Sequence, residues 1–206
     1  IYNYRIMNKY KTIFKKNILM MMILIIVLGL SFWFLDLVQR NKHINKIPLG
    51  GGFVLTNQNG EIFDSKKIKK KKLIYFGYTF CPDVCPFDIL RISKVFENNP
   101  SLIEQIQPIF ITVDPERDTP ENLRSFLENF SSDIIGLTGN NEQIKEVIKK
   151  FKIYVKYNKS SELDSNYLVD HSSLVFLIDE KDNYLRFYRS NEFTEYKFIN
   201  TLKEVL

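Results

Sequence analysis

The chain has 206 residues, and 29 Lys and Arg against 24 Asp and Glu give it a formal net charge of +5, which suits one domain with an additional segment. All five excess positive charges lie in residues 1–17, which contain no acidic side chain, so the main body is electrically balanced and nucleic acid is a poor candidate partner. With only two Cys and two His, a disulfide-rich scaffold is excluded.

A long apolar run follows the basic segment. Residues 18–35 carry no charge, and at about 1.5 Å per residue they extend about 27 Å, close to the thickness of a bilayer core. No small-residue cleavage pattern follows, which favours an uncleaved anchor over a signal peptide. We therefore expect a cytoplasmic basic segment at 1–17 and a single transmembrane helix at 18–37. By the positive-inside rule, the remainder lies on the periplasmic side of a bacterial inner membrane.

The part after the anchor divides into a tether at 38–50 and one domain at 51–206. The Asn-Gly signal near Gly60 predicts a hairpin between strands at 53–56 and 61–63. Further strands are expected at 73–78, 109–113, 134–137, 153–157, 173–179 and 184–189, and an irregular excursion runs on to residue 170. Four helices are expected. The first begins near Cys85, the second begins at Pro120 with Thr119 as its cap, and the other two span 141–151 and 194–206.

Strands that alternate with helices, with fully apolar central strands, indicate an α/β domain with parallel strand pairs. Six lysines lie among the seven residues from Lys66 to Lys72. A solvated loop is the first interpretation of this run, and docking to an acidic partner or to lipid headgroups is the second.

Two cysteines and one histidine carry the chemistry. Cys81 and Cys85 lie where an apolar strand passes into a helix, and the helix N-terminus there favours a thiolate. His171 is the only histidine after His43, and it precedes another apolar strand. Two thiolates and one imidazole suit copper, Cu(I) or Cu(II), better than a structural zinc site, which needs a fourth ligand.

Three motifs, in this order, resemble the Sco/SenC family of copper proteins: FGYTFCPDVCP at 76–86, TVDPERDTP at 112–120 and VDHS at 169–172. The resemblance implies a thioredoxin-like fold, here with the hairpin as an N-terminal extension, and copper held by Cys81, Cys85 and His171. It also implies a role in assembling the binuclear copper site of cytochrome c oxidase subunit II, by copper delivery, by reduction of that site's cysteines, or both. A copper donor protein would be a further partner.

Other interpretations of the same residues stay open. The cysteines could form a structural disulfide, act in thiol–disulfide exchange, or serve copper or redox sensing, so enzymatic activity is left undecided. Asp83 tunes the thiolates, contacts a partner, or is simply a carboxylate at the start of the helix. Asp170 either orients His171 or caps a turn. In the segment 114–120, Arg117 and Asp118 are expected to flank the site or to pair and hold the turn.

Overall fold

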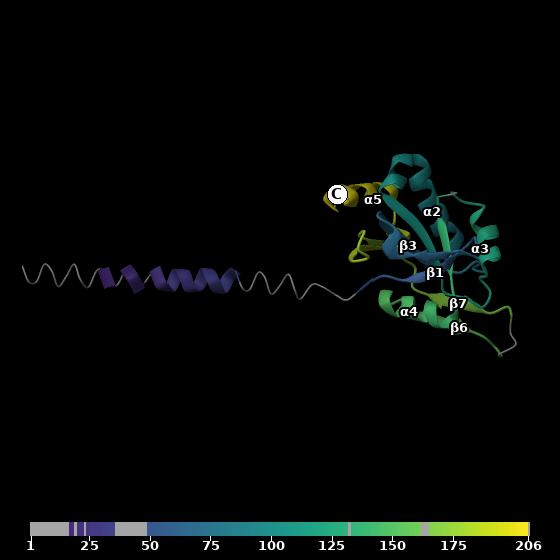
Figure 1. Ribbon diagram of the computed structural model, residues 1–206, viewed down its shortest axis with the longest axis horizontal. Helices are drawn as coiled ribbons and strands as arrows, with labels where there is room; N and C mark the ends of the chain where they lie inside the picture. Colours follow the sequence, from purple (N-terminus) through teal and green to yellow (C-terminus); the bar gives the residue numbers. More distant parts are fainter. Residues whose placement is uncertain are drawn as a thin grey trace, which may run out of the picture. The chain divides into compact units, whose positions relative to one another are not determined.

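The computed structural model describes residues 17–18, 20–22, 24–35, 49–131, 133–161 and 165–205 (Figure 1). The chain forms two units, Ile1–Ile47 and Pro48–Leu206. All the strands and the helices discussed below belong to the second unit.

The prediction of a transmembrane helix at 18–37 is wrong. Among the described residues, no helix has both the length and the apolar character that a bilayer span requires. Residues 1–16 of the predicted basic segment and residues 38–48 of the predicted tether lie outside the described residues.

A seven-stranded mixed sheet forms the centre of the domain, in the order β2-β1-β5-β4-β3-β8-β9. The neighbouring pairs β3–β4 and β4–β5 are parallel, and the other pairs are antiparallel. The strands of this sheet are β1 (Val54–Asn57), β2 (Ile62–Asp64), β3 (Lys71–Gly77), β4 (Ile106–Thr112), β5 (Ile135–Thr138), β8 (Leu174–Ile178) and β9 (Tyr184–Arg189). A separate two-stranded sheet consists of β6 (Val155–Asn158) and β7 (Leu168–His171).

Helices cover both faces of the large sheet. They are α2 (Val84–Asn98), α3 (Pro120–Leu127), α4 (Asn141–Phe151) and α5 (Glu195–Val205), with short 3-10 turns at Ser65–Lys67, Pro100–Glu104 and Ser190–Glu192. Neighbouring residues of a strand point to opposite faces. Accordingly, Tyr75 donates to Asp88 of α2 at 2.9 Å, while the Phe76 ring packs 5.2 Å from Phe151 of α4. Thus α2 and α4 lie on opposite sides of β3 (Figure 1).

Most of the predicted elements are confirmed, with shifts of a few residues at their ends. The hairpin forms as β1 and β2, and Gly60 takes the positive φ of 82° that its turn requires. Thr119 caps α3, and α4 occupies the predicted range 141–151. The structure differs between residues 157 and 170, where the expected irregular excursion contains the additional strand β7.

The lysine run is not a uniformly solvated loop, because Lys72 is fully buried. Its ammonium donates to Asp182 at 2.7 Å, and the other Asp182 oxygen accepts from Ser65 at 2.8 Å. The Ser65 hydroxyl oxygen accepts in turn from the backbone N–H of Phe53 at 2.9 Å. This buried network joins the first hairpin, β3 and the β8–β9 turn.

We expect Asp182→Asn to lower the free energy of unfolding by about 3 kcal/mol or more, because it leaves the buried Lys72 charge uncompensated. Asn is chosen because Asp182 has a positive φ of 65°, which Asn tolerates. Glu180→Gln, which breaks the partly exposed Lys71–Glu180 pair, is the matched control and should cost less than about 1 kcal/mol. Urea unfolding of the three proteins measures both values, and equal losses would contradict the interpretation.

Candidate metal centre

Two segments that are distant in the sequence bring Cys81 and Cys85 together with His171. Cys81 lies in the turn after β3, where its N–H donates to Tyr78 O at 3.3 Å. Cys85 is the second residue of α2 and is fully buried, whereas Cys81 is partly exposed. His171 is the last residue of β7. The Cys85 Sγ and His171 Nε2 atoms are 3.3 Å apart, and Cys85 N–H donates to Cys81 Sγ at 3.5 Å.

The histidine is held in one tautomer by the backbone. His171 Nδ1 lies 3.2 Å from the Ser172 carbonyl oxygen, which can only accept a hydrogen bond. Nδ1 therefore carries the proton, and Nε2 presents its lone pair to Cys85. Burial lowers the pKa of His171, so the imidazole is neutral at pH 7. A neutral imidazole with a free Nε2 is the form that binds a metal ion.

The two thiols have opposite protonation preferences. A hydrogen bond from the Cys85 thiol lowers the pKa of Cys81 to about 5. The backbone N–H groups of Asp83 and Cys85 also lower it, whereas partial burial raises it. Donation to Cys81, together with burial, raises the pKa of Cys85 well above its usual range. At pH 7, Cys81 is thus a thiolate and Cys85 a thiol.

Two tyrosine rings line the imidazole, and sequence reasoning missed both. Tyr78 and Tyr75 approach His171 edge-on, with ring centroids 6.0 and 6.4 Å away. Tyr75 also donates to the buried carboxylate of Asp88, which is paired with Arg91 at 2.9 Å. Tyr75 belongs to an apolar strand, so nothing in the sequence separates it from an ordinary core residue.

The two aspartates predicted beside the ligands are exposed. Asp83 precedes α2, but its carboxylate makes no capping hydrogen bond, and only its backbone N–H reaches Cys81. Asp170 pairs with Lys156 in the β6–β7 ladder and, being next to His171 in the strand, points to the opposite face. Its influence on the imidazole is electrostatic, whereas Ser172 O supplies the hydrogen bond.

The segment from Asp114 to Asp118 flanks the site with a pairing that differs from the expected one. Arg117 pairs with Asp114, not with Asp118. The buried Asp118 accepts instead from Thr79 N–H at 3.0 Å and from the Thr112 hydroxyl at 2.6 Å. Asp118 therefore ties the segment just before Cys81 to the end of β4.

The donor set fits a metal ion by its chemistry and by its spacing. In the described residues, no three or more His, Cys, Asp or Glu side chains are already arranged around a metal-sized space. Instead, Cys85 Sγ lies within hydrogen-bond distance of His171 Nε2 and the Cys85 thiol also interacts with Cys81, although its single proton serves only one of these acceptors at a time. Metal–sulfur and metal–nitrogen bonds of about 2.3 and 2.0 Å place two ligands about 3.5 Å apart, so the 3.3 Å contact needs only a small opening.

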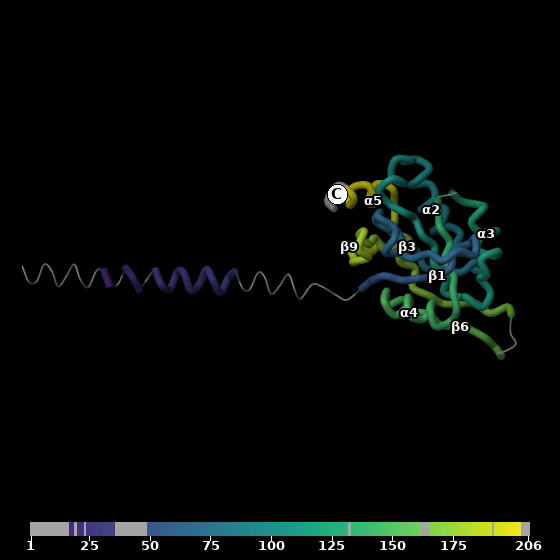
Figure 2. The backbone as a smooth tube through the Cα atoms, viewed as in Figure 1, coloured from purple at the N-terminus to yellow at the C-terminus, as the bar shows by residue number. Residues whose placement is uncertain are grey.

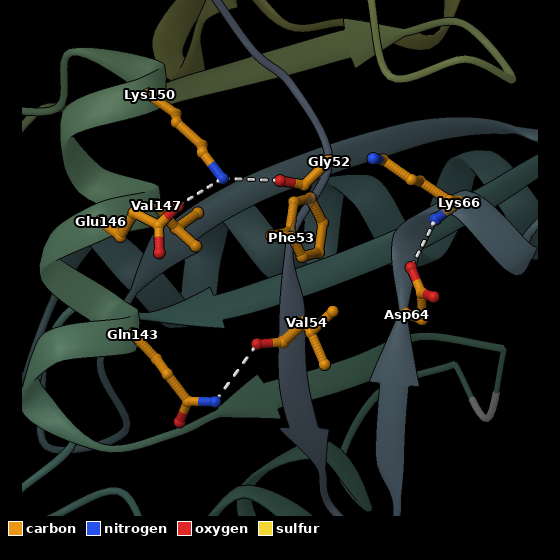
Figure 3. Close-up of a pocket in the computed structure, with 9 residues that line it drawn as sticks. All are labelled: Gly52, Phe53, Val54, Asp64, Lys66, Gln143, Glu146, Val147 and Lys150. Carbon is orange, nitrogen blue, oxygen red and sulfur yellow. Dashed lines mark hydrogen bonds and ion pairs between the residues drawn. The ribbon is translucent and has the colours of Figure 1, made fainter.

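The described domain also has a cavity of about 390 Å³ between β1 and α4 (Figure 3). None of the predicted site residues lines it. Lys150 beside it donates to Gly52 O at 2.7 Å and pairs with Glu146 at 2.7 Å (Figure 3). Because these polar groups satisfy one another, the cysteine–histidine cluster remains the stronger candidate site.

Comparison with known proteins agrees with the motifs. The SCO1/SenC family model matches residues 41–206. A SCO2-like protein of Rickettsia prowazekii is 46% identical over 151 residues, covering 73% of this chain and 74% of the relative. The human mitochondrial SCO1 homologue is 36% identical over 157 residues, and these are 75% of this chain and 52% of that protein.

Solved structures show the same fold. Bradyrhizobium japonicum ScoI with copper bound superposes with a TM-score of 0.69 at 36% identity, covering 77% of this chain and 99% of that one. Arabidopsis thaliana ScoI with copper bound gives a TM-score of 0.67 at 34% identity, covering 76% and 98%. The thioredoxin-like α/β architecture is therefore confirmed, and this chain belongs to the SCO1/SenC family.

Proposed function

We propose that this protein is a copper-binding assembly factor for cytochrome c oxidase, with Cys81, Cys85 and His171 as its copper ligands. The observation that carries the proposal is the 3.3 Å contact between Cys85 Sγ and the unprotonated Nε2 of His171, beside the Cys81 sulfur. Two sulfurs and one imidazole favour copper over the harder divalent cations. Relatives with 34–36% identity have been solved with copper bound, which supports the same cargo here.

The cluster suits a site that carries copper as cargo, because it can hold the metal ion and still be reached by a partner protein. Cys85 is enclosed by the β3–α2 junction, and His171 is fixed by its backbone hydrogen bond. Cys81 is partly exposed and can be reached by another protein. We propose subunit II of the oxidase as the recipient and a separate copper protein as the donor. The periplasmic location expected from the sequence stays a prediction.

His171→Ala should weaken copper binding by at least about 100-fold, because it removes one of three ligands and loss of even an outer partner costs about 10- to 100-fold. Anaerobic titration against a chromophoric copper chelator measures the affinity, and X-ray absorption counts the sulfur and nitrogen ligands. His43→Ala, which changes the other histidine of the chain, should behave as wild type. Unchanged affinity in His171→Ala would overturn the ligand assignment.

The thiolate at Cys81 favours a second candidate function, the reduction of cysteines in the target protein. An exposed thiolate can attack a disulfide, and a protonated thiol beside it can complete the exchange. In that case His171→Ala should keep most of the reductase activity, whereas Cys81→Ser and Cys85→Ser should each abolish it. Reduction of an oxidised peptide with two cysteines, followed by mass spectrometry, separates this function from copper delivery.

The difference between the two thiols can be tested by alkylation. Cys81 should react with iodoacetamide much faster than Cys85, because it is exposed and ionised at pH 7. Its rate should be nearly constant above pH 7 and fall as the pH drops through about 5, as expected for a lowered thiol pKa. Peptide mapping at several pH values measures both rates. A Cys81 rate that rises through about pH 8.5, like that of a free thiol, would contradict the assignment.

A further inference from the structure

His171 reaches the cysteines on a ribbon that is not part of the main sheet. Among the described residues, the strands β6 and β7 pair only with each other (β6 is labelled in Figure 2). In their ladder, Val155 lies opposite His171. Hydrogen bonds within the ribbon fix its shape but not its place on the domain. The position of the imidazole therefore depends on the short connection from His171 to β8 and on the side chains that hold the ribbon against the domain.

Arg117 makes the most extensive of these contacts. Its Nε donates to Asp114, and its Nη1 donates to the backbone oxygens of Ser165 at 3.2 Å and Tyr167 at 2.9 Å. The guanidinium carbon lies 3.6 Å from the centroid of the Tyr167 ring. The Tyr167 hydroxyl donates to the same Asp114 carboxylate at 2.6 Å. Arg117 thereby clamps the start of β7 onto the turn after β4.

The same guanidinium also touches the segment that carries Cys81. It lies over the Phe80 ring, with 4.9 Å between the guanidinium carbon and the ring centroid, and 5.7 Å from the Tyr78 ring. Phe80 directly precedes Cys81, and Tyr78 contacts the His171 ring and accepts from Val169 N–H at 3.3 Å. One planar cation is thus sandwiched between the cysteine turn and the histidine ribbon.

We propose that Arg117 is a positioning residue that sets the distance between His171 and the cysteine pair. A guanidinium stacks with its flat face on an aromatic ring and donates from a fixed planar fork, whereas a lysine ammonium is a compact point charge with neither the flat face nor the fork. Only the expected effect of Arg117 on copper affinity rests on the proposed function. The docking of the β6–β7 ribbon by Arg117 is a property of the metal-free protein and does not depend on that function.

Amide hydrogen exchange of the metal-free protein tests the docking. In Arg117→Ala, the amides of β6 and β7 should exchange at least about 10-fold faster than in wild type, while those of β3 stay within about 3-fold. Arg124→Ala is the matched control, because Arg124 also donates twice to a backbone oxygen, that of Gln58, but does not touch the site. It should leave the exchange of β6 and β7 unchanged.

The copper complex provides a readout that general destabilisation would not produce. In Cu(II)-loaded wild type, electron paramagnetic resonance should show coupling to an imidazole nitrogen. In Arg117→Ala, that coupling should weaken or disappear, and the copper affinity should fall by about 10- to 100-fold, as for other residues that orient a metal ligand. Arg117→Lys should resemble Arg117→Ala because it keeps the charge but loses the stacking and the forked donation.

The outcomes separate this inference from the proposed function. If wild type binds no copper, the proposed function fails, and hydrogen exchange still decides the docking. If wild type binds copper and both Arg117 variants keep the nitrogen coupling and wild-type exchange in β6 and β7, the inference is overturned. Should Arg117→Ala fail to fold, Arg117→Lys and Tyr167→Leu, which removes the stacking surface, provide the same two readouts.

Discussion

The contact between Cys85 and His171, residues 86 positions apart in the sequence, is the constraint on which the candidate site depends. It follows from the pairing of β3 with β8. Tyr75 lies opposite Val175 in that antiparallel ladder, so the residues just before β8 come next to the end of β3, where the cysteine turn begins. The main sheet thus delivers both halves of the site to one edge. The β6–β7 ribbon and the Arg117 clamp complete the placement of the imidazole.

The cluster is asymmetric in exposure as well as in charge. Cys85 is fully buried, whereas Cys81 and His171 are both partly exposed. The side chains of Phe80, Val84 and Phe87, which are close to Cys81 in the sequence, are exposed. A partner protein can therefore reach Cys81 while Cys85 stays covered. This arrangement suits the proposed transfer of a soft metal ion between proteins, since a thiolate can be exchanged at the surface while the buried Cys85 still holds the cargo.

The sequence predicted those elements in which one physical signal dominates. Apolar runs predicted β3, β4 and β8, and the Thr119–Pro120 cap predicted the start of α3. The rarity of Cys and His in this chain pointed to the metal ligands. The predictions failed where tertiary contacts decide. Lys72 is paired with Asp182, 110 residues away, and Arg117 pairs with Asp114 rather than with its neighbour Asp118. The transmembrane prediction failed separately, since no described helix has the length and apolar character of a bilayer span. The strand β7 is short and follows an irregular loop, so no periodicity reveals it.

The imidazole is the feature that distinguishes the two candidate activities. A thiolate at Cys81 and a buried thiol at Cys85 are sufficient for disulfide exchange, because the first can attack and the second can resolve. Exchange of this kind needs no third group fixed in one tautomer with its lone pair directed at a sulfur. A metal ion needs such a group, because each ligand must present an electron pair. Disulfide exchange by the two cysteines does not require the hydrogen bond from His171 to the Ser172 backbone. This hydrogen bond therefore favours copper binding as the primary role of the site.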